Sequence, residues 1–153
     1  MGQEVKGKSF TEGDFDLFKK KLQDETKVIL DHFEKKNFVT PEVPLCGLEM
    51  EAWLINYDSL PNPIAENFLK KINNPLIVPE ISQFNFEINT EPALLEGKIF
   101  SKFHKNLKET FNKCRNVANS LDSKAVFIGS LPTIRKYMLD LEYIYPNMRY
   151  YAL

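Results

Sequence analysis

The first part of the chain carries hydrophobic side chains at helical spacing. Ser9 lies three residues before Glu12, which is the spacing of a capping box at the start of a helix. The hydrophobic residues that follow recur mostly every three or four positions, at Phe15, Phe18, Leu22, Ile29, Leu30 and Phe33. This pattern predicts a long amphipathic helix over residues 10–36, whose other face carries charges of both signs and is exposed to solvent.

Two later segments alternate hydrophobic and polar residues, as strands with one buried face do. In residues 45–57, one face would carry Leu48, Met50, Ala52 and Leu54, and the other Gly47, Glu49, Glu51 and Trp53. In residues 76–90, the hydrophobic positions Phe84, Phe86 and Ile88 alternate with the polar positions Gln83, Asn85, Glu87 and Asn89. Both segments are therefore predicted to be strands, with their glutamates on the face opposite the core.

Two further helices and a third strand complete the central part. Asn62 and Pro63 predict the cap and first turn of a short helix that stops before Pro75. Residues 97–121 return to helical spacing, and the apolar run 125–131 predicts a strand. The expected fold class is α+β, an antiparallel sheet packed with amphipathic helices.

The last residues predict one more helix and an incomplete sheet. Pro146 is suited to open a helix that continues from Met148 to Leu153 without a C-terminal cap. Three strands would leave edges that a larger sheet normally pairs. We expect residues 1–153 to form a single domain that is the N-terminal part of a longer protein.

Composition restricts the class of protein. The chain has 153 residues, of which 43% are hydrophobic and 27% are charged, as in a soluble globular domain. With 20 Lys+Arg against 21 Asp+Glu, no overall basic field favours nucleic acid or an anionic membrane as partner. No segment has the length of a membrane span or the apolar centre of a signal peptide, so we expect a cytoplasmic protein.

The cysteines and histidines show no motif of their own. Cys46 and Cys114 are too few for a disulfide framework and lack the spacing of zinc ligands, so both are expected to be reduced core residues. His32 and His104 lie in helical patterns, where we expect helix-surface positions.

The strand carboxylates are the first candidates for chemistry. Glu49 and Glu51 would project from one face about 7 Å apart, given a strand rise of roughly 3.3 Å per residue. Mg²⁺ or Mn²⁺ would relieve their repulsion, whereas the alternative is a solvated face of an antiparallel sheet. Glu80 and Glu87 bracket the second strand with opposite parity. Both face one site only if a bulge intervenes or Glu80 precedes the regular strand.

These segments together carry a resemblance to a known family. The stretch Gly47-Leu48-Glu49-Met50-Glu51-Ala52-Trp53, followed by the stretch from Glu80 to Thr90, resembles the glutamate-cysteine ligase family, in particular its bacterial second type. The later stretch from Ile128 to Thr133 and the pair Arg149-Tyr150 are similar to further family positions. The resemblance covers about residues 45–153.

The resemblance implies a fold, a reaction and a set of ligands. Its fold is glutamine-synthetase-like, with an antiparallel sheet as a curved floor whose glutamates hold two or three Mg²⁺ ions and, through them, ATP. The γ-carboxylate of glutamate attacks the γ-phosphate of ATP, and an amine such as that of cysteine displaces the resulting acyl phosphate, as in glutathione biosynthesis. The family's metal-binding positions correspond to Glu49, Glu51, Glu80 and Glu87. The remainder of the ligase chain or a second subunit would be a further partner.

Other residues are candidates for substrate binding. Phosphoryl transfer depends mainly on positioning and charge neutralisation, so the reaction needs no Ser, Cys or His nucleophile, and we name no catalytic residue. Asn89 and Thr90 are neutral hydrogen-bonding candidates, and Arg149 could pair with a substrate carboxylate. The alternatives are a strand-end cap for the first two and a helix-surface position for the arginine.

Two other functions stay open at this point. A metal-dependent phosphohydrolase or nuclease would also use clustered carboxylates, although the near-neutral charge argues against a nucleic-acid groove. A binding module without enzymatic activity would use the helix at residues 10–36 to dock on a partner.

Overall fold

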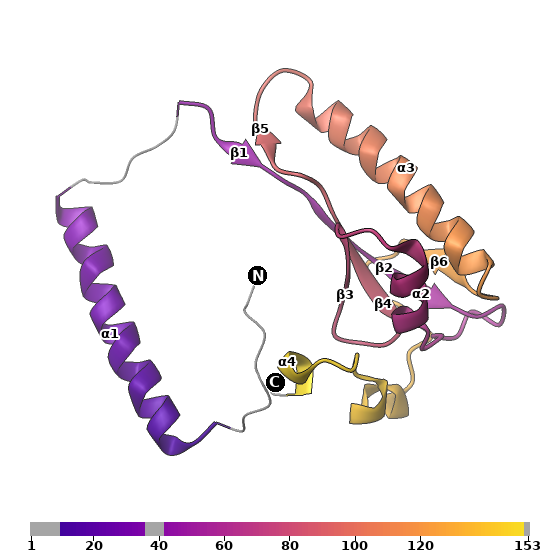
Figure 1. Cartoon of the computed structure of the whole chain (residues 1–153), viewed down its shortest axis with the longest axis horizontal. Helices are drawn as coiled ribbons and strands as arrows, with labels where there is room; N and C mark the ends of the chain where they lie inside the picture. The colour runs from indigo at the N-terminus through magenta and orange to yellow at the C-terminus, as the bar shows by residue number, and fades with distance from the viewer. Residues whose placement is uncertain (1–9, 36–41, 152–153) are drawn as a thin grey trace.

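The computed structural model describes residues 10–35 and 42–151 (Figure 1). Its first half contains α1 (Glu12–Glu34), β1 (Leu45–Cys46), β2 (Glu49–Ile55), α2 (Ala65–Ile72), β3 (Ile77–Pro79) and β4 (Asn85–Asn89). Its second half contains β5 (Ala93–Leu94), α3 (Ile99–Asn119), β6 (Lys124–Val126), the 3₁₀ helices η1 (Lys136–Leu139) and η2 (Leu141–Tyr143), and α4 (Met148–Tyr151). The α+β class expected from the sequence is confirmed.

The central sheet has four antiparallel strands in the order β3-β4-β2-β6, and β1 pairs with β5 in a separate ribbon. In β2 and β4, Ala52 pairs with Phe86 on the buried face, and Glu51 pairs with Glu87 on the other face. The alternation read from the sequence is therefore confirmed, and it separates an apolar face from an acidic one.

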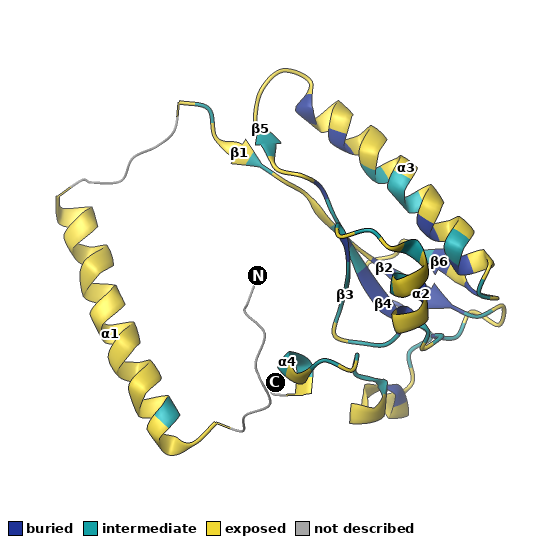
Figure 2. Cartoon of the chain, viewed as in Figure 1, coloured by how far each residue is buried: buried dark blue, intermediate teal, exposed yellow. Residues whose placement is uncertain are grey.

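The apolar face of the sheet carries the core, with α2 and α3 packed against it (Figure 2). Phe68 of α2 and Phe86 of β4 are fully buried, with ring centroids 4.5 Å apart. Cys114 of α3 is also fully buried, and burial raises the pKa of its thiol to about 12. Cys46, by contrast, is only half-buried in the β1–β5 ribbon. The prediction of a core thiol thus holds for Cys114 and is wrong for Cys46.

All three predicted strand segments contain strands that are shorter than the sequence patterns predicted. Residues 45–57 form two strands, β1 and β2, separated by Gly47 and Leu48. Residues 76–90 form a hairpin, because β3 ends at Pro79 and β4 runs back beside it. In the apolar run 125–131 the strand ends at Val126, and Phe127 and Ile128 are exposed. The apolar run is longer than the strand, because β6 forms backbone pairs only with residues 53–55 of β2.

The start of α2 also differs from the prediction. Asn62 and Pro63 precede the helix, whose cap is Ile64 without a side-chain hydrogen bond. The backbone carbonyl of Asn62 instead accepts a hydrogen bond from the Ile64 N–H at 2.8 Å. The helix ends at Asn73, which adopts a left-handed conformation (φ 43°) that Asn tolerates well.

The long helix α1 spans Glu12–Glu34, slightly shorter than the predicted 10–36. Its capping box uses Thr11 and Asp14: the Asp14 N–H donates to Thr11 Oγ1 at 3.3 Å, and the Thr11 N–H donates to Asp14 Oδ2 at 2.8 Å. Ser9, the cap expected from the sequence, lies outside the described residues. No helix in the described ranges combines the length and apolar composition that crossing a bilayer requires.

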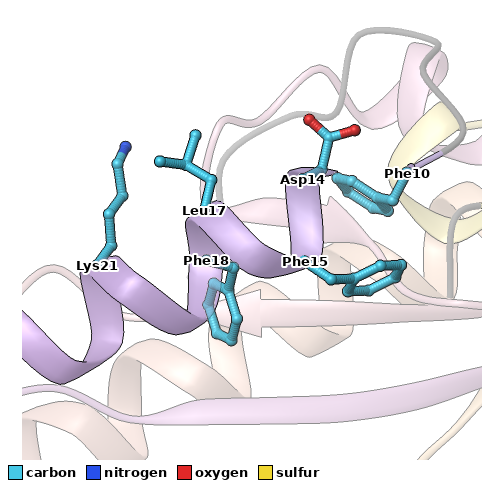
Figure 3. Close-up of a pocket in the computed structure, with 6 residues that line it drawn as sticks. All are labelled: Phe10, Asp14, Phe15, Leu17, Phe18 and Lys21. Atoms are coloured by element: carbon cyan, nitrogen blue, oxygen red, sulfur yellow. The ribbon is translucent and has the colours of Figure 1, made fainter. Parts of the chain in front are cut away.

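No residue of α1 is buried, although the helix carries an apolar stripe (Figure 2). Phe15, Phe18 and Phe33 are 61%, 64% and 65% exposed. Figure 3 shows the side chains at the start of the helix, which bound a shallow hollow of about 460 Å³ formed by α1 and Phe10 alone. This helix therefore contributes nothing to the core of the sheet domain.

We expect removal of residues 1–41 to leave the melting temperature within about 2 °C of the full chain, because α1 buries no side chain in the core. Thermal unfolding followed by circular dichroism measures this. A drop of about 10 °C would mean that α1 packs on the sheet domain after all.

Candidate metal centre

Three carboxylates meet on the acidic face of the sheet. Glu51 of β2 and Glu87 of β4 are direct partners in the antiparallel register. Glu80 follows the last residue of β3 and begins the connection to β4. One carboxylate oxygen of each of the three residues lies within 4.8 Å of the other two. We call Glu51, Glu80 and Glu87 the carboxylate cluster.

The hairpin settles how Glu80 and Glu87 reach one site. Their parity is opposite along the sequence, but β3 ends at Pro79, so Glu80 precedes the regular strand β4. The chain turns back after Glu80, and the side chain approaches Glu87 from the connection without a bulge. The sequence left open a bulge or a position of Glu80 before the regular strand, and the structure has Glu80 before the strand.

Within the cluster, a raised pKa is found for Glu80. Partial burial, a hydrogen bond with the Glu87 carboxyl and repulsion from Glu51 and Glu87 together raise the pKa of Glu80 to about 7. The Ile81 N–H donates to Glu80 Oε2 at 3.3 Å and opposes this rise only weakly. Below neutral pH, a proton on Glu80 therefore relieves the repulsion among the three carboxylates.

A hard divalent cation would relieve the same repulsion at higher pH. Mg²⁺ and Mn²⁺ prefer oxygen ligands, and Mg²⁺ is normally held by one or a few carboxylates with its other positions filled by water or phosphate. The three carboxylates can supply about half of an octahedral ligand set. Water or a substrate oxygen would have to supply the remaining ligands of such a cation.

Glu49, the fourth predicted metal ligand, does not join the cluster. It is exposed at the start of β2 and is paired with Asn89, two residues along the strand from Glu51. Two residues of strand correspond to about 7 Å. Glu49 thus lies on the same face as the cluster, two residues along β2 from Glu51.

Asn89 and Thr90 have different surroundings. The Asn89 Nδ2 donates to Glu87 Oε1 at 2.7 Å, which holds one oxygen of the Glu87 carboxylate in place. The buried Thr90 hydroxyl accepts from the Leu48 N–H at 2.8 Å and donates to the Leu48 carbonyl at 3.3 Å. Asn89 therefore touches the cluster, whereas the hydroxyl of Thr90 joins the end of β4 to the start of β2.

Arg149 lies on an element that contacts the hairpin. The Tyr150 hydroxyl donates to the Pro79 carbonyl at 3.0 Å, which anchors α4 one residue before Glu80. The Arg149 guanidinium lies 5.8 Å from the centroid of the Tyr150 ring and is half-buried. The role of Tyr150 could not be read from the sequence, since it depends on a contact between positions 71 residues apart.

The segment 128–133 after β6, which the sequence likened to ligase-family positions, makes structural contacts with β2 and with the loop that follows it. The Ile128 carbonyl accepts from Trp53 Nε1 at 2.8 Å, and the Thr133 hydroxyl donates to the Ser59 carbonyl at 2.6 Å. These bonds hold the segment 128–133 along the end of β2. Ile128 and Thr133 therefore have structural roles, and the candidate site consists of the carboxylate cluster.

Comparison with known proteins does not identify a function for the chain. No family model matches the chain, and neither the curated proteins nor the solved structures contain a match. The resemblance to glutamate-cysteine ligases accordingly stays a prediction from the sequence.

The raised pKa of Glu80 predicts a pH-dependent cost to stability. Its folded-state value of about 7 exceeds the ordinary 4.5, so the folded protein binds the extra proton and loses stability as pH rises from about 4.5 to 7. We expect Glu80→Gln to raise stability at pH 8 by roughly 1 kcal/mol, after allowing for solvent screening, and to have no such effect at pH 4. Urea unfolding at the two pH values measures the difference.

The exposed Glu91 provides the matched control, because Glu91→Gln makes the same chemical change outside the cluster. Equal effects of Glu80→Gln at pH 4 and pH 8 would contradict the electrostatic account of the cluster.

Proposed function

We propose that the carboxylate cluster binds Mg²⁺ or Mn²⁺ and that the chain takes part in an ATP-dependent ligase reaction between a carboxylate and an amine, of the glutamate-cysteine ligase type. The single observation that carries the proposal is the approach of three carboxylates to within 4.8 Å on the face of the antiparallel sheet opposite the core. The expected substrates are glutamate, ATP and an amine such as cysteine.

The proposed reaction is a phosphoryl transfer followed by acyl transfer. An oxygen of the glutamate γ-carboxylate forms a bond to the γ-phosphorus of ATP while the bond to ADP breaks. The amine then attacks the acyl carbon, inorganic phosphate leaves, and the amine loses a proton. A bound cation would supply charge neutralisation for the transferring phosphoryl group.

The residues of this chain have separate tasks in that scheme. Glu51, Glu80 and Glu87 hold the cation, and Asn89 orients Glu87 through its 2.7 Å hydrogen bond. Arg149, on the helix anchored at Pro79, is available to pair with the α-carboxylate of glutamate. Glu80 must lose its proton before it can act as a ligand, so the activity should rise with pH through about 7.

Release of ADP tests the proposed function. With Mg²⁺ and ATP present, ADP formation should require both glutamate and an amine, and cysteine is the first amine to supply. Phosphate release that needs neither substrate, or cleavage of a phosphodiester, would instead favour a metal-dependent phosphohydrolase or nuclease. Loss of either activity in Glu51→Gln, with retention in Glu91→Gln, would assign it to the cluster.

A second candidate function is binding through α1. The observation in its favour is the apolar stripe of this helix, on which Phe15, Phe18 and Phe33 are all more than 60% exposed. Such a stripe suits docking on a second subunit or on the rest of a ligase. Sedimentation of the full chain and of residues 42–153 tests it: concentration-dependent association should disappear with α1, and a monomeric full chain would count against self-association.

A further inference from the structure

An apolar groove of about 410 Å³ runs beside α3, on the face of the sheet that carries the core. Most of the side chains that line it are hydrophobic, namely Leu48, Met50, Phe100, Leu107, Phe111 and Phe127. The lining residues on α3 recur every three or four positions, so they form one face of that helix. The groove is thus bounded by one face of α3, the start of β2 and the residue that follows β6.

The inner part of the groove belongs to the core, whereas its outer part is exposed. Met50, Leu107 and Phe111 pack against the core, and the ring of Phe111 lies 6.1 Å from that of Phe127 in an edge-to-face arrangement. Phe100 and Phe127, however, are 62% and 60% exposed. Large hydrophobic side chains that are exposed together mark a surface where another molecule binds.

The helix α1 has the form that fits such a groove. Its apolar stripe consists of Phe15, Phe18, Leu22, Ile29 and Phe33, none of which is buried. At a rise of 1.5 Å per residue, α1 is about 34 Å long and α3 about 31 Å long. An amphipathic helix that lays its apolar face into a hydrophobic groove is a recurring mode of recognition. Docking of α1 along α3 would cover both exposed apolar surfaces at once.

The two helices carry opposite net charges. Within its bounds, α1 has seven acidic and four basic residues, whereas α3 has one acidic and five basic residues. One of these basic residues, Lys108, lines the groove and makes no salt bridge with the described residues. Complementary charge favours a correct pair of surfaces, and like charge disfavours a wrong one. The charges therefore favour α1 against α3 over α1 against a second α1.

Within one chain, α1 and the groove do not meet. Figure 1 shows α1 and α3 at opposite ends of the molecule, and no residue of α1 is buried. An α1 that fills the groove in this arrangement of the chain therefore comes from a second copy. In a two-fold arrangement each copy supplies α1 to the groove of the other, which closes the assembly at two chains.

We propose that the groove along α3 binds α1 of a second copy of this chain, and that the two copies exchange these helices about a two-fold axis. The apolar stripe of α1 covers Phe100 and Phe127, and the acidic helix lies beside Lys108. The inference rests on the second candidate function, binding through α1, and names the partner and the surface that α1 binds. It is independent of the carboxylate cluster, which lies on the opposite face of the sheet.

Sedimentation equilibrium of the full chain, from well below to well above the expected dissociation constant, tests the exchange of helices. We expect a monomer–dimer equilibrium with a dissociation constant on the order of 10–100 µM, as for a weak interface. At the lowest concentrations the chain is then a monomer, and the melting temperature expected after removal of residues 1–41 refers to this state.

Phe18→Asp in α1 and Phe127→Asp in the groove each place a charge in the proposed contact. Both side chains are exposed, at 64% and 60%, so the substitutions should leave the fold of the chain intact. Each should raise the dissociation constant at least about tenfold, because the dimer would bury a carboxylate without a partner. Leu141→Asp is the matched control: Leu141 is 68% exposed and lies outside both surfaces, so the dissociation constant should not change.

Lys108→Glu tests the charge match between the two helices. It should raise the dissociation constant at least about fivefold, because the groove would then repel the acidic α1. Lys136→Glu makes the same change of net charge at an exposed position of η1 outside the groove, and it should leave the constant close to that of the wild type. Equal constants for the two variants would contradict docking beside Lys108.

The outcomes separate this inference from binding through α1 in general. If Phe18→Asp abolishes the dimer and Phe127→Asp does not, α1 binds elsewhere on the second copy, which overturns the groove and leaves the second candidate function standing. A full chain that stays a monomer at every concentration overturns both the inference and self-association through α1. If Phe127→Asp fails to fold, Phe100→Asp replaces it, and an unchanged dissociation constant in this variant overturns the inference.

Discussion

Replacing Glu51 and Glu87 together with glutamine should weaken Mn²⁺ binding by at least about a hundredfold, or roughly 2.7 kcal/mol. The two side chains face each other in the register of β2 and β4, and each offers an oxygen to the same point as Glu80. The substitutions keep the shape of both side chains and remove two of three negative charges. The charge of the ligand set is a main determinant of affinity for such cations, so the loss should be large.

A calorimetric titration at pH 8 measures this effect, and Glu49→Gln is its closest control. Glu49 lies on the same strand and the same face but outside the cluster, so its replacement should cost much less affinity than Glu51→Gln alone. If Glu49→Gln and Glu51→Gln weaken Mn²⁺ binding equally, the metal site extends along β2 and includes Glu49, and the three-residue cluster is not the complete ligand set. Equal binding by wild type and the double variant would mean that the cluster holds no cation.

The affinity for Mn²⁺ should fall about a hundredfold between pH 8 and pH 5. Glu80 has a pKa of about 7, so at pH 5, two units below, a proton occupies it in nearly every molecule. A cation must then displace that proton, and binding near pH 6 should release close to one proton per cation. Titrations in buffers of different ionisation enthalpy measure both the affinity and the released proton.

Glu80→Gln removes the titrating group and provides the test of its role. This variant should bind Mn²⁺ more weakly than the wild type at pH 8, and its affinity should vary much less between pH 5 and pH 8. A wild-type affinity that does not change over this range would contradict the account, as would a variant that keeps the full pH dependence.

The sheet and its two faces were predictable because alternation with a period of two is a local property of the sequence. Once Ala52 and Phe86 are taken as core residues, Glu51 and Glu87 must lie on the opposite face. Their direct pairing depends on the register of the two strands, which the structure supplies, because a shift by two residues would keep the same faces. The shared face of the two glutamates was therefore available from the sequence, and their pairing was not.

The position of Glu80 was only partly predictable. Whether residues 76–90 form one strand or a hairpin depends on pairing across the sheet, which periodicity does not reveal. The sequence could offer two alternatives, a bulge or a position before the strand, and the hairpin selects the second. The raised pKa follows from this packing and could not be foreseen from residue spacing.

Contacts between distant segments were the least predictable features. The groove along α3 is formed by α3, the start of β2 and the residue after β6, which share no sequence signal. The Asn62–Pro63 pair has the composition of a helix start, yet α2 begins later, at Ala65. Local signals such as caps compete with tertiary packing, and here packing determines the helix boundary.

The most direct test of the central claim is an anomalous diffraction map of crystals of the full chain soaked in Mn²⁺ at pH 8. The account predicts one strong peak bounded by Glu51, Glu80 and Glu87, at about 2.0–2.3 Å from a carboxylate oxygen of each. A map with no peak at these three side chains, or with the ion held elsewhere on the molecule, would contradict it.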